Sequence, residues 1–218
     1  MHDGVGVDPL PLRKPPGGGP DSSRSLRLFL IAYAAITAVA IGIGFARGRP
    51  NLLVCPAALT WPSRGAAHLA SLVGGVAFAA LVVGGTRTLV RRSAWAAALH
   101  EDLRPFARAL APEAIPLVAL ASSIGEEALF RGALVPLVGV VASSVLFGAL
   151  HQVRGRSRLP WWAFATVVGL VLGALLRATG SLLGPLVAHA AINGLNLRFL
   201  VTHDPQRTPR LGGLLGRR

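Results

Sequence analysis

Long runs without charge divide this chain into segments of membrane-spanning length. A helix needs about 20 apolar residues to cross the hydrocarbon core of a bilayer, with about 17–25 tolerated. Five charge-free runs satisfy this requirement, and they occupy residues 28–46, 65–86, 132–153, 159–176 and 178–197. The pattern therefore predicts five transmembrane helices.

A sixth predicted span, residues 114–136, contains charged side chains. Residues 114–125 are free of charge but too few to cross a membrane, and the helix reaches spanning length only by continuing through Glu126, Glu127 and Arg131. Ionisable side chains inside a bilayer are costly unless they are paired, so they indicate a functional site by default. This stretch is the most informative part of the sequence.

Residues 93–111, between the spans predicted at 65–86 and 114–136, have a different pattern. The apolar positions are Trp95, Leu99, Leu103, Phe106 and Leu110. Steps of three and four residues place them on one helical face, which predicts an amphipathic helix lying on the cytoplasmic interface of the membrane. The expected fold is thus an all-α, polytopic membrane helix bundle with about six transmembrane helices and one cytoplasmic amphipathic helix.

The composition agrees with a membrane protein. Hydrophobic residues make up 52% of the 218 positions and charged residues only 14%, whereas soluble globular domains carry about 25% charge. A soluble domain and a disordered chain are therefore both excluded. The single cysteine, Cys55, excludes an intramolecular disulfide.

The charge is strongly positive, with 22 Lys and Arg against 9 Asp and Glu. Such a balance can indicate a nucleic-acid partner, but in the six-span arrangement 17 of the 22 basic residues fall on one side of the membrane. The positive-inside rule then places both termini in the cytoplasm. We expect a multi-pass protein of the cell membrane, with the lipid bilayer and no nucleic acid as its partner.

These patterns divide the chain into five parts. They are a disordered cytoplasmic segment (1–25), two transmembrane helices (26–92), the interfacial amphipathic helix (93–111), a catalytic helix bundle (112–201) and a basic cytoplasmic tail (202–218).

The first candidate motif is Glu126-Glu127-x-x-x-Arg131. Residues four apart lie on one helical face, whereas neighbours diverge by about 100°. Glu127 and Arg131 can therefore form an intrahelical ion pair, while Glu126 points elsewhere and is available as a general base. Two adjacent glutamates with one arginine can thus have different roles.

Two further motifs have the same four-residue spacing, Phe147-x-x-x-His151 on the next helix and His189-x-x-x-Asn193 on the last. Taken singly, an intramembrane His or Asn often serves as an interhelical hydrogen-bonding group, and a Glu–Arg pair can simply join two helices. Taken together, so many costly polar groups favour a site at which Glu126 and the two histidines converge. The remaining histidines carry no site in this interpretation: His68 is expected to pack, and His100 and His203 to be solvated.

The three motifs, in this order, resemble those of the CPBP family of intramembrane proteases, which includes CAAX prenyl protease 2 and the bacterial Abi proteins. The resemblance covers residues 112–200 and includes FRG after the glutamates and GPLVAH, which ends at the second histidine. It implies an intramembrane endopeptidase that cuts a membrane-associated peptide or protein. The Ala-, Arg- and Gly-rich composition indicates a GC-rich bacterium, in which prenylated CAAX proteins are not the expected substrate.

The resemblance also implies roles for individual residues. Glu126 would activate water with help from His151, His189 and Asn193 would stabilise the oxyanion, and Glu127 with Arg131 would hold the charge and geometry of the site. If the reaction depends on zinc, Glu126, His151 and His189 would be the ligands. A metal-free glutamate protease is preferred, because His-x-x-x-Asn lacks the His-Glu-x-x-His pair of zinc proteases.

Two other functions remain open on the sequence alone. One is a non-proteolytic immunity or regulatory partner with the same fold. The other is a small proton-coupled transporter, which is disfavoured because the chain lacks the duplicated halves that many transporters show.

Overall fold

A computed structural model describes residues 20–205, all the named elements of which are helical. The long helices are α1 (Pro20–Ala46), α2 (Arg64–Arg92), α3 (Ala94–Ala109), α4 (Ile115–Glu126), α5 (Val135–Leu150), α6 (Arg158–Thr179) and α7 (Leu183–Thr202). Three short segments complete them: η1 (Pro112–Ala114), the π-helical η2 (Glu127–Leu134) and η3 (Gly155–Ser157).

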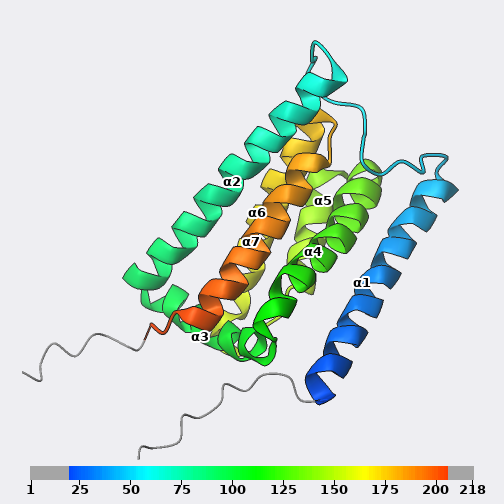
Figure 1. Ribbon diagram of the computed structural model, residues 1–218. Coiled ribbons are helices and arrows are strands. Elements are labelled where there is room, and N and C mark those ends of the chain that lie inside the picture. Colours follow the sequence, from blue (N-terminus) through cyan, green and yellow to red (C-terminus); the bar gives the residue numbers. More distant parts are fainter. Residues whose placement is uncertain (1–19, 206–218) are drawn as a thin grey trace, which may run out of the picture.

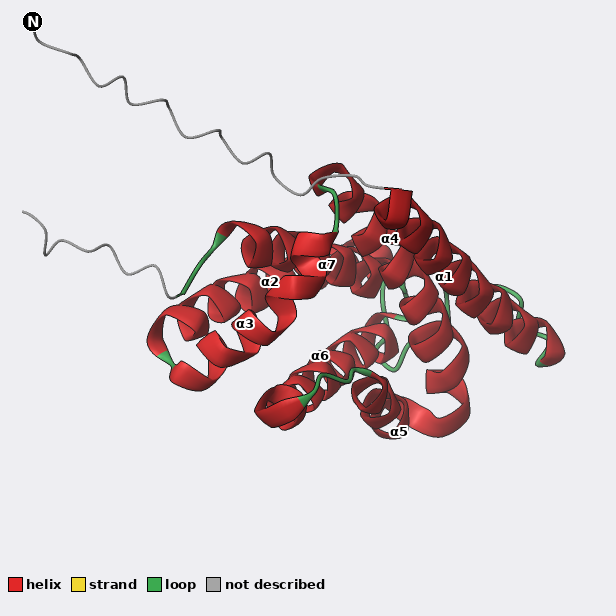
Figure 2. Cartoon of the chain, turned by 90° about the horizontal axis from the view of Figure 1, so that it is seen from below, coloured by secondary structure: helices red, strands yellow, loops and turns green. Residues whose placement is uncertain are grey.

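The long helices run side by side as a bundle, with α3 lying across one end (Figure 1). Helix α7 packs against α2 and α4, α5 packs against α6, and α1 covers the outer side of α4 and η2. The view along the bundle shows α1 at the edge and α3 beside α2 (Figure 2). Within the described residues, the all-α prediction is confirmed.

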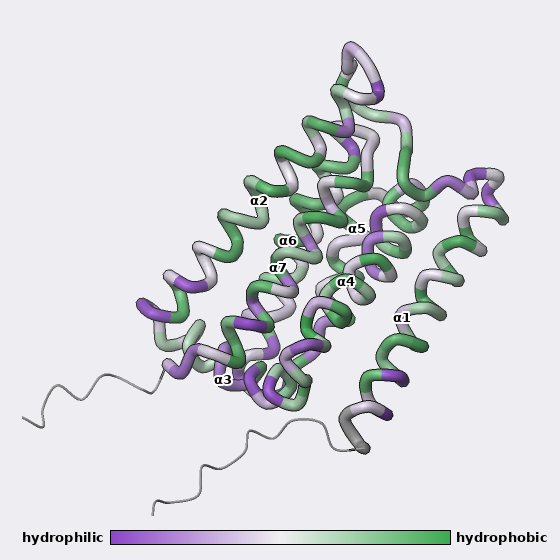
Figure 3. The backbone as a smooth tube through the Cα atoms, in the orientation of Figure 1, coloured by the Kyte–Doolittle hydropathy of each residue, from purple (hydrophilic) through white to green (hydrophobic). Residues whose placement is uncertain are grey.

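Four helical stretches in the described part of the chain are long and apolar enough to cross a membrane: Ser23–Ala46, Arg64–Arg92, Pro112–Leu150 and Gly155–Thr179. Hydrophilic residues gather mainly at the two ends of the bundle (Figure 3). Large apolar side chains point outward along the helices, for example Leu81 of α2, which is 71% exposed. Outward apolar faces suit a lipid environment, and the chain is a multi-pass membrane protein.

The stretch from α4 to α5 contains the two overlapping spans predicted at 114–136 and 132–153. It is helical throughout except at Gly139, whose φ of 81° and ψ of 170° break the helix. A positive φ is costly for residues with a Cβ, so glycine is required at this break. The predicted end of the first span near Pro136 lies three residues before it, and helix α5 ends at Leu150 rather than at residue 153.

Helix α7 is 20 residues long but is not among the stretches that are apolar enough to cross a membrane. It carries His189, Asn193 and Asn196 within its length, and these polar residues lower its mean hydropathy. The predicted number of six spans therefore remains a prediction.

Helix α3 occupies the region predicted for the amphipathic helix and packs one of its faces against α7 and α2. The buried residues are Ala96, His100, Arg104 and Ala107, whereas Trp95 and Phe106 are each 52% exposed. The prediction that His100 is solvated is wrong: its side chain is 3% exposed and its Nε2 donates to the carbonyl of His203 at 3.2 Å. The cytoplasmic position of this helix remains a prediction.

The chain termini are described only in part. The segment predicted to be disordered, residues 1–25, lies outside the described residues up to position 19, but positions 20–25 belong to α1. The predicted basic tail lies outside the described residues from position 206 onward.

Backbone hydrogen bonds join the loop after α1 to the turn between α6 and α7. The amide of Cys55 donates to the carbonyl of Gly180, and the amide of Leu182 donates to the carbonyl of Leu53, both at 2.9 Å. Nearby, His68 of α2 has a polar partner that the sequence did not predict, since its Nδ1 lies 2.7 Å from the hydroxyl of Ser181. This end of the bundle is thus fixed by hydrogen bonds between distant segments.

Candidate active site

Glu126 and Glu127 lie where the α-helical α4 gives way to the π-helical η2. Single π-helical turns within α-helices often occur at functional sites. Both glutamates are buried, with 9% and 0% of their surface exposed. The sequence thus places two carboxyl groups at a change of helical geometry inside the bundle.

Glu127 is buried between a guanidinium and an imidazole. The guanidinium of Arg131 approaches its Oε1 to 3.0 Å, which confirms the predicted ion pair, and Nδ1 of His189 lies 2.7 Å from the same oxygen. The guanidinium also stacks over the ring of Phe147 at 4.2 Å. Arg131 and Glu127 are among the largest side chains in the described part of the chain that are fully buried.

Glu126 has a different set of neighbours. Its Oε1 accepts a hydrogen bond of 2.7 Å from the hydroxyl of Tyr33 on α1. Its Oε2 faces two imidazoles, with Nε2 of His189 at 3.5 Å and Nε2 of His151 at 3.8 Å. This oxygen is buried and has no hydrogen-bond partner among the described residues.

The two histidines are held from behind. Nδ1 of His189 contacts Glu127, and Nδ1 of His151 lies 2.7 Å from the carbonyl of Phe147. His151 was expected on a helix, but it lies just after the end of α5 with φ −85° and ψ 83°. Its Nε2 faces Glu126 from this position. Glu126, His151 and His189 therefore lie close together in the structure.

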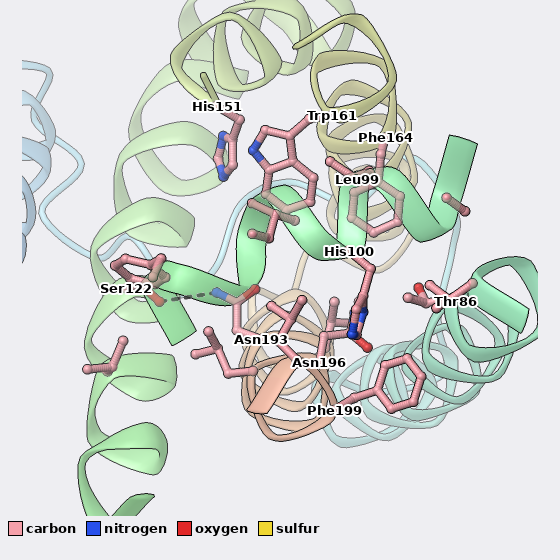
Figure 4. A pocket seen from close by; sticks show the side chains of 18 of the residues that line it. Thr86, Leu99, His100, Ser122, His151, Trp161, Phe164, Asn193, Asn196 and Phe199 are labelled. Carbon is pink, nitrogen blue, oxygen red and sulfur yellow. Dashed lines mark hydrogen bonds between the residues drawn. The ribbon is translucent and has the colours of Figure 1, made fainter. Parts of the chain in front are cut away.

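Asn193 lies one turn after His189 on α7, and its Nδ2 donates to the hydroxyl of Ser122 on α4 at 3.1 Å. Figure 4 shows this hydrogen bond at the wall of a cavity. The cavity measures about 250 Å³, and its lining includes Tyr33, Ser122, Glu126, His151, Trp161 and Asn193. Glu126 thus opens to a space in which a substrate could lie.

Three of these residues were missed by sequence reasoning: Tyr33, Ser122 and Trp161. Tyr33 is the only tyrosine in the chain and interrupts an otherwise apolar span, which is a weak indication of a polar role. Ser122 sits one helical turn before Glu126. Trp161 stacks on Phe164 and meets His151 edge-on at 5.9 Å, and nothing in its sequence context indicates a site.

The possible zinc ligands Glu126, His151 and His189 approach one another, but they do not form a metal-binding set. Among the described residues, no group of three or more His, Cys, Asp or Glu side chains is placed so that it could hold a metal ion.

Comparison with known proteins identifies the segment that carries this site. Residues 109–195 match the family model described as type II CAAX prenyl endopeptidase, Rce1-like. This segment is similar to the CPBP family. The matched segment contains all six of the candidate residues Glu126, Glu127, Arg131, His151, His189 and Asn193.

A curated relative of this chain is the uncharacterized protein YpbD of Bacillus subtilis (strain 168). The two are 33% identical over 81 residues, which make up 37% of this chain and 42% of that protein. The similarity thus spans less than half of the relative's length. No solved structure matches this chain.

Proposed function

We propose that this protein is an intramembrane endopeptidase that hydrolyses peptide bonds of membrane-associated peptides or proteins. The family match, whose description names an endopeptidase, supports peptide-bond hydrolysis. The observation that carries the proposal is the state of Glu126 Oε2, a buried carboxylate oxygen without a hydrogen-bond partner that faces two imidazoles at the wall of a cavity.

In the proposed reaction, Glu126 takes a proton from a water molecule at Oε2, and the water oxygen attacks the carbonyl carbon of the substrate. His151, whose Nε2 faces the same oxygen, assists this proton transfer. The tetrahedral intermediate then collapses, the C–N bond breaks, and the proton held by Glu126 passes to the leaving amine. General base and acid assistance of this kind contributes about 10²- to 10⁴-fold to a rate.

Asn193 and His189 are the proposed donors to the oxyanion. The Nδ2 amide group has two hydrogens, so Asn193 can keep its bond to Ser122 and offer the second to the substrate. His189 donates through Nε2 when both of its ring nitrogens carry hydrogen. Donors that are fixed before the charge develops stabilise the transition state without reorganisation.

Glu127 and Arg131 have a supporting role in this proposal. The ion pair, at 3.0 Å, places a carboxylate against Nδ1 of His189 and so fixes the orientation of that ring. A carboxylate behind a histidine sets which ring nitrogen faces the reacting groups.

The proposed reaction is metal-free. A strong chelator is expected to leave cleavage intact in membranes or in detergent-purified protein. Loss of cleavage that added zinc restores would contradict this version and support zinc ligation by Glu126, His151 and His189.

The proposal includes an orientation, with both termini in the cytoplasm of a bacterial cell and substrate entering from that side. Its support is the positive-inside distribution of the basic residues. The cavity also extends to α3, which the sequence predicts at the cytoplasmic interface.

The test compares the terminal peptides of membrane proteins from cells carrying either the wild-type chain or Glu126→Ala at matched expression. New protein ends that depend on the wild type are expected, and they would name the substrate. Identical ends in the two samples, with the variant still rescuing a knockout phenotype, would contradict the proposal and support a non-proteolytic partner with the same fold.

A further inference from the structure

Asn196 extends the polar face of α7 beyond the candidate catalytic residues. His189, Asn193 and Asn196 are spaced by four and three residues, which places them on one face of the helix. Asn193 and Asn196 lie next to each other at the cavity (Figure 4), and both belong to its lining. Asn196 is not part of any of the three motifs.

The carboxamide oxygen of Asn196 has no hydrogen-bond partner among the described residues. This oxygen, Oδ1, is buried, whereas the neighbouring Asn193 donates to Ser122. About 90% or more of buried polar groups in proteins are paired. An unpaired amide oxygen at the wall of a cavity therefore suggests a partner that arrives with a ligand.

The surroundings of Asn196 define what that ligand offers. The cavity lining includes the polar residues Glu126, Asn193 and His100 and the apolar residues Leu99 and Leu103 of α3. A ligand in the cavity thus meets apolar surface with a few polar groups, one of which is the amide of Asn196. An amide carries both a donor and an acceptor, so it is complementary to the peptide group of a polypeptide backbone in either orientation.

We infer that Asn196 is a substrate-binding residue whose carboxamide pairs with a backbone peptide group of the substrate close to the bond that is cut. This inference rests on the proposed endopeptidase function. Three residues along a helix span about 4.5 Å, and an extended chain advances about 3.3 Å per residue. The paired group is therefore one or two residues from the scissile bond, and the apolar side chains next to it lie against α3.

The test uses the purified full chain in detergent and internally quenched peptides that span a cleavage site found in the terminal-peptide comparison described above. A series of these peptides carries a single N-methyl group on successive backbone amides. For the wild type, one N-methyl position within two residues of the cut is expected to raise KM about tenfold, the effect of one lost hydrogen bond of typical strength.

Asn196→Leu is expected to raise KM by about the same factor while kcat changes little, and the N-methyl group should then have no further effect. Thr166→Val is the matched control, because its hydroxyl is also buried without a partner but is not part of the cavity lining. Unchanged kinetics in Asn196→Leu, or an N-methyl penalty that persists in it, would overturn the inference.

Thermal unfolding without peptide separates this inference from the proposed function. Asn196→Leu removes an unpaired buried polar group, so its Tm is expected to equal or exceed that of the wild type. A clear fall in Tm would show that the amide has a structural partner, and would overturn the inference. If the wild type cuts none of the peptides, the proposed activity on this substrate class fails, while the Tm comparison still decides whether the amide is free for a ligand.

Discussion

Two carboxylates that are neighbours in the chain lie in different surroundings. Glu127 is fully enclosed and contacts a guanidinium and an imidazole. Glu126 lines a cavity, and its hydrogen bond comes from the neutral hydroxyl of Tyr33. The second carboxylate oxygen of each glutamate has no hydrogen-bond partner among the described residues, so the difference lies in the cavity and in the charged neighbour. Two adjacent residues thus differ in their chemistry. The charge of Glu127 is neutralised by its ion pair, whereas the carboxylate of Glu126 is free to react.

The difference follows from helical geometry. Adjacent residues diverge by about 100° around a helix, so the two side chains leave the α4–η2 junction toward different elements. Glu127 points toward Arg131 of η2 and Glu126 toward Tyr33 of α1, while His189 of α7 faces both, with Nδ1 toward Glu127 and Nε2 toward Glu126. We therefore assign a stabilising role to Glu127 with its contacts and a catalytic role to Glu126 with its contacts. These two groups of residues are called the Glu127 region and the Glu126 region.

The largest expected effect comes from breaking the Glu127 region. Arg131→Met leaves Glu127 buried with only His189 beside it, and removing one partner of a buried ion pair typically costs about 3–5 kcal/mol. We expect a loss of that size in the free energy of unfolding, measured in detergent. The double variant Glu127→Gln/Arg131→Met should recover part of it, because it removes the uncompensated charge. Wild-type stability in Arg131→Met would contradict a structural role for the pair.

A smaller effect is expected when the Glu126 region is altered without touching the carboxylate. Tyr33→Phe removes the hydrogen bond that holds Oε1 and keeps the ring, which packs on Phe29 at 4.5 Å. The loss of one hydrogen bond to a charged group predicts about a tenfold or somewhat larger fall in kcat/KM, with stability nearly unchanged. Cleavage at the wild-type rate would show that Tyr33 does not position Glu126.

The smallest effect concerns the imidazole of His100 on α3. Burial lowers the pKa of His100, despite the carbonyl of His203 and the carboxylate of Glu101, which act in the opposite direction. The unfolded chain then binds the proton more readily, so stability is fully present above about pH 6.5 and falls as the pH drops below it.

Replacing His100 by glutamine removes this titration. We expect thermal unfolding measured at pH 7.5, 6.5 and 5.5 to show a shallower decline in Tm for His100→Gln than for the wild type. Equal slopes would mean that other groups dominate the pH dependence.

Much of the fold was predictable, because charge-free runs and four-residue spacings depend only on residues that are close together in the sequence. The Glu127–Arg131 pair follows directly from the helical repeat, and the convergence of His151 and His189 on Glu126 follows from their costly burial. The break at Gly139 was not predicted, since the surrounding residues are apolar on both sides and give no sign of where two overlapping spans divide.

Other features depend on contacts between distant segments, which one sequence does not reveal. Tyr33 reaches Glu126 across 93 positions, and Ser122 reaches Asn193 across 71. The burial of His100 arises where α3 packs against the end of α7, which is a contact between distant segments. These residues required the arrangement of the helices.

The most direct test of the division between the two carboxylates compares Glu126→Gln with Glu127→Gln in membranes at matched protein levels. New protein ends are counted by terminal-peptide mass spectrometry, and the fraction still folded after heating is measured in the same samples. We predict that Glu126→Gln loses the ends, by about 10²- to 10⁴-fold in rate, and unfolds like the wild type, whereas Glu127→Gln unfolds at a clearly lower temperature. Wild-type cleavage by Glu126→Gln would contradict the account, as would wild-type heat resistance in Glu127→Gln.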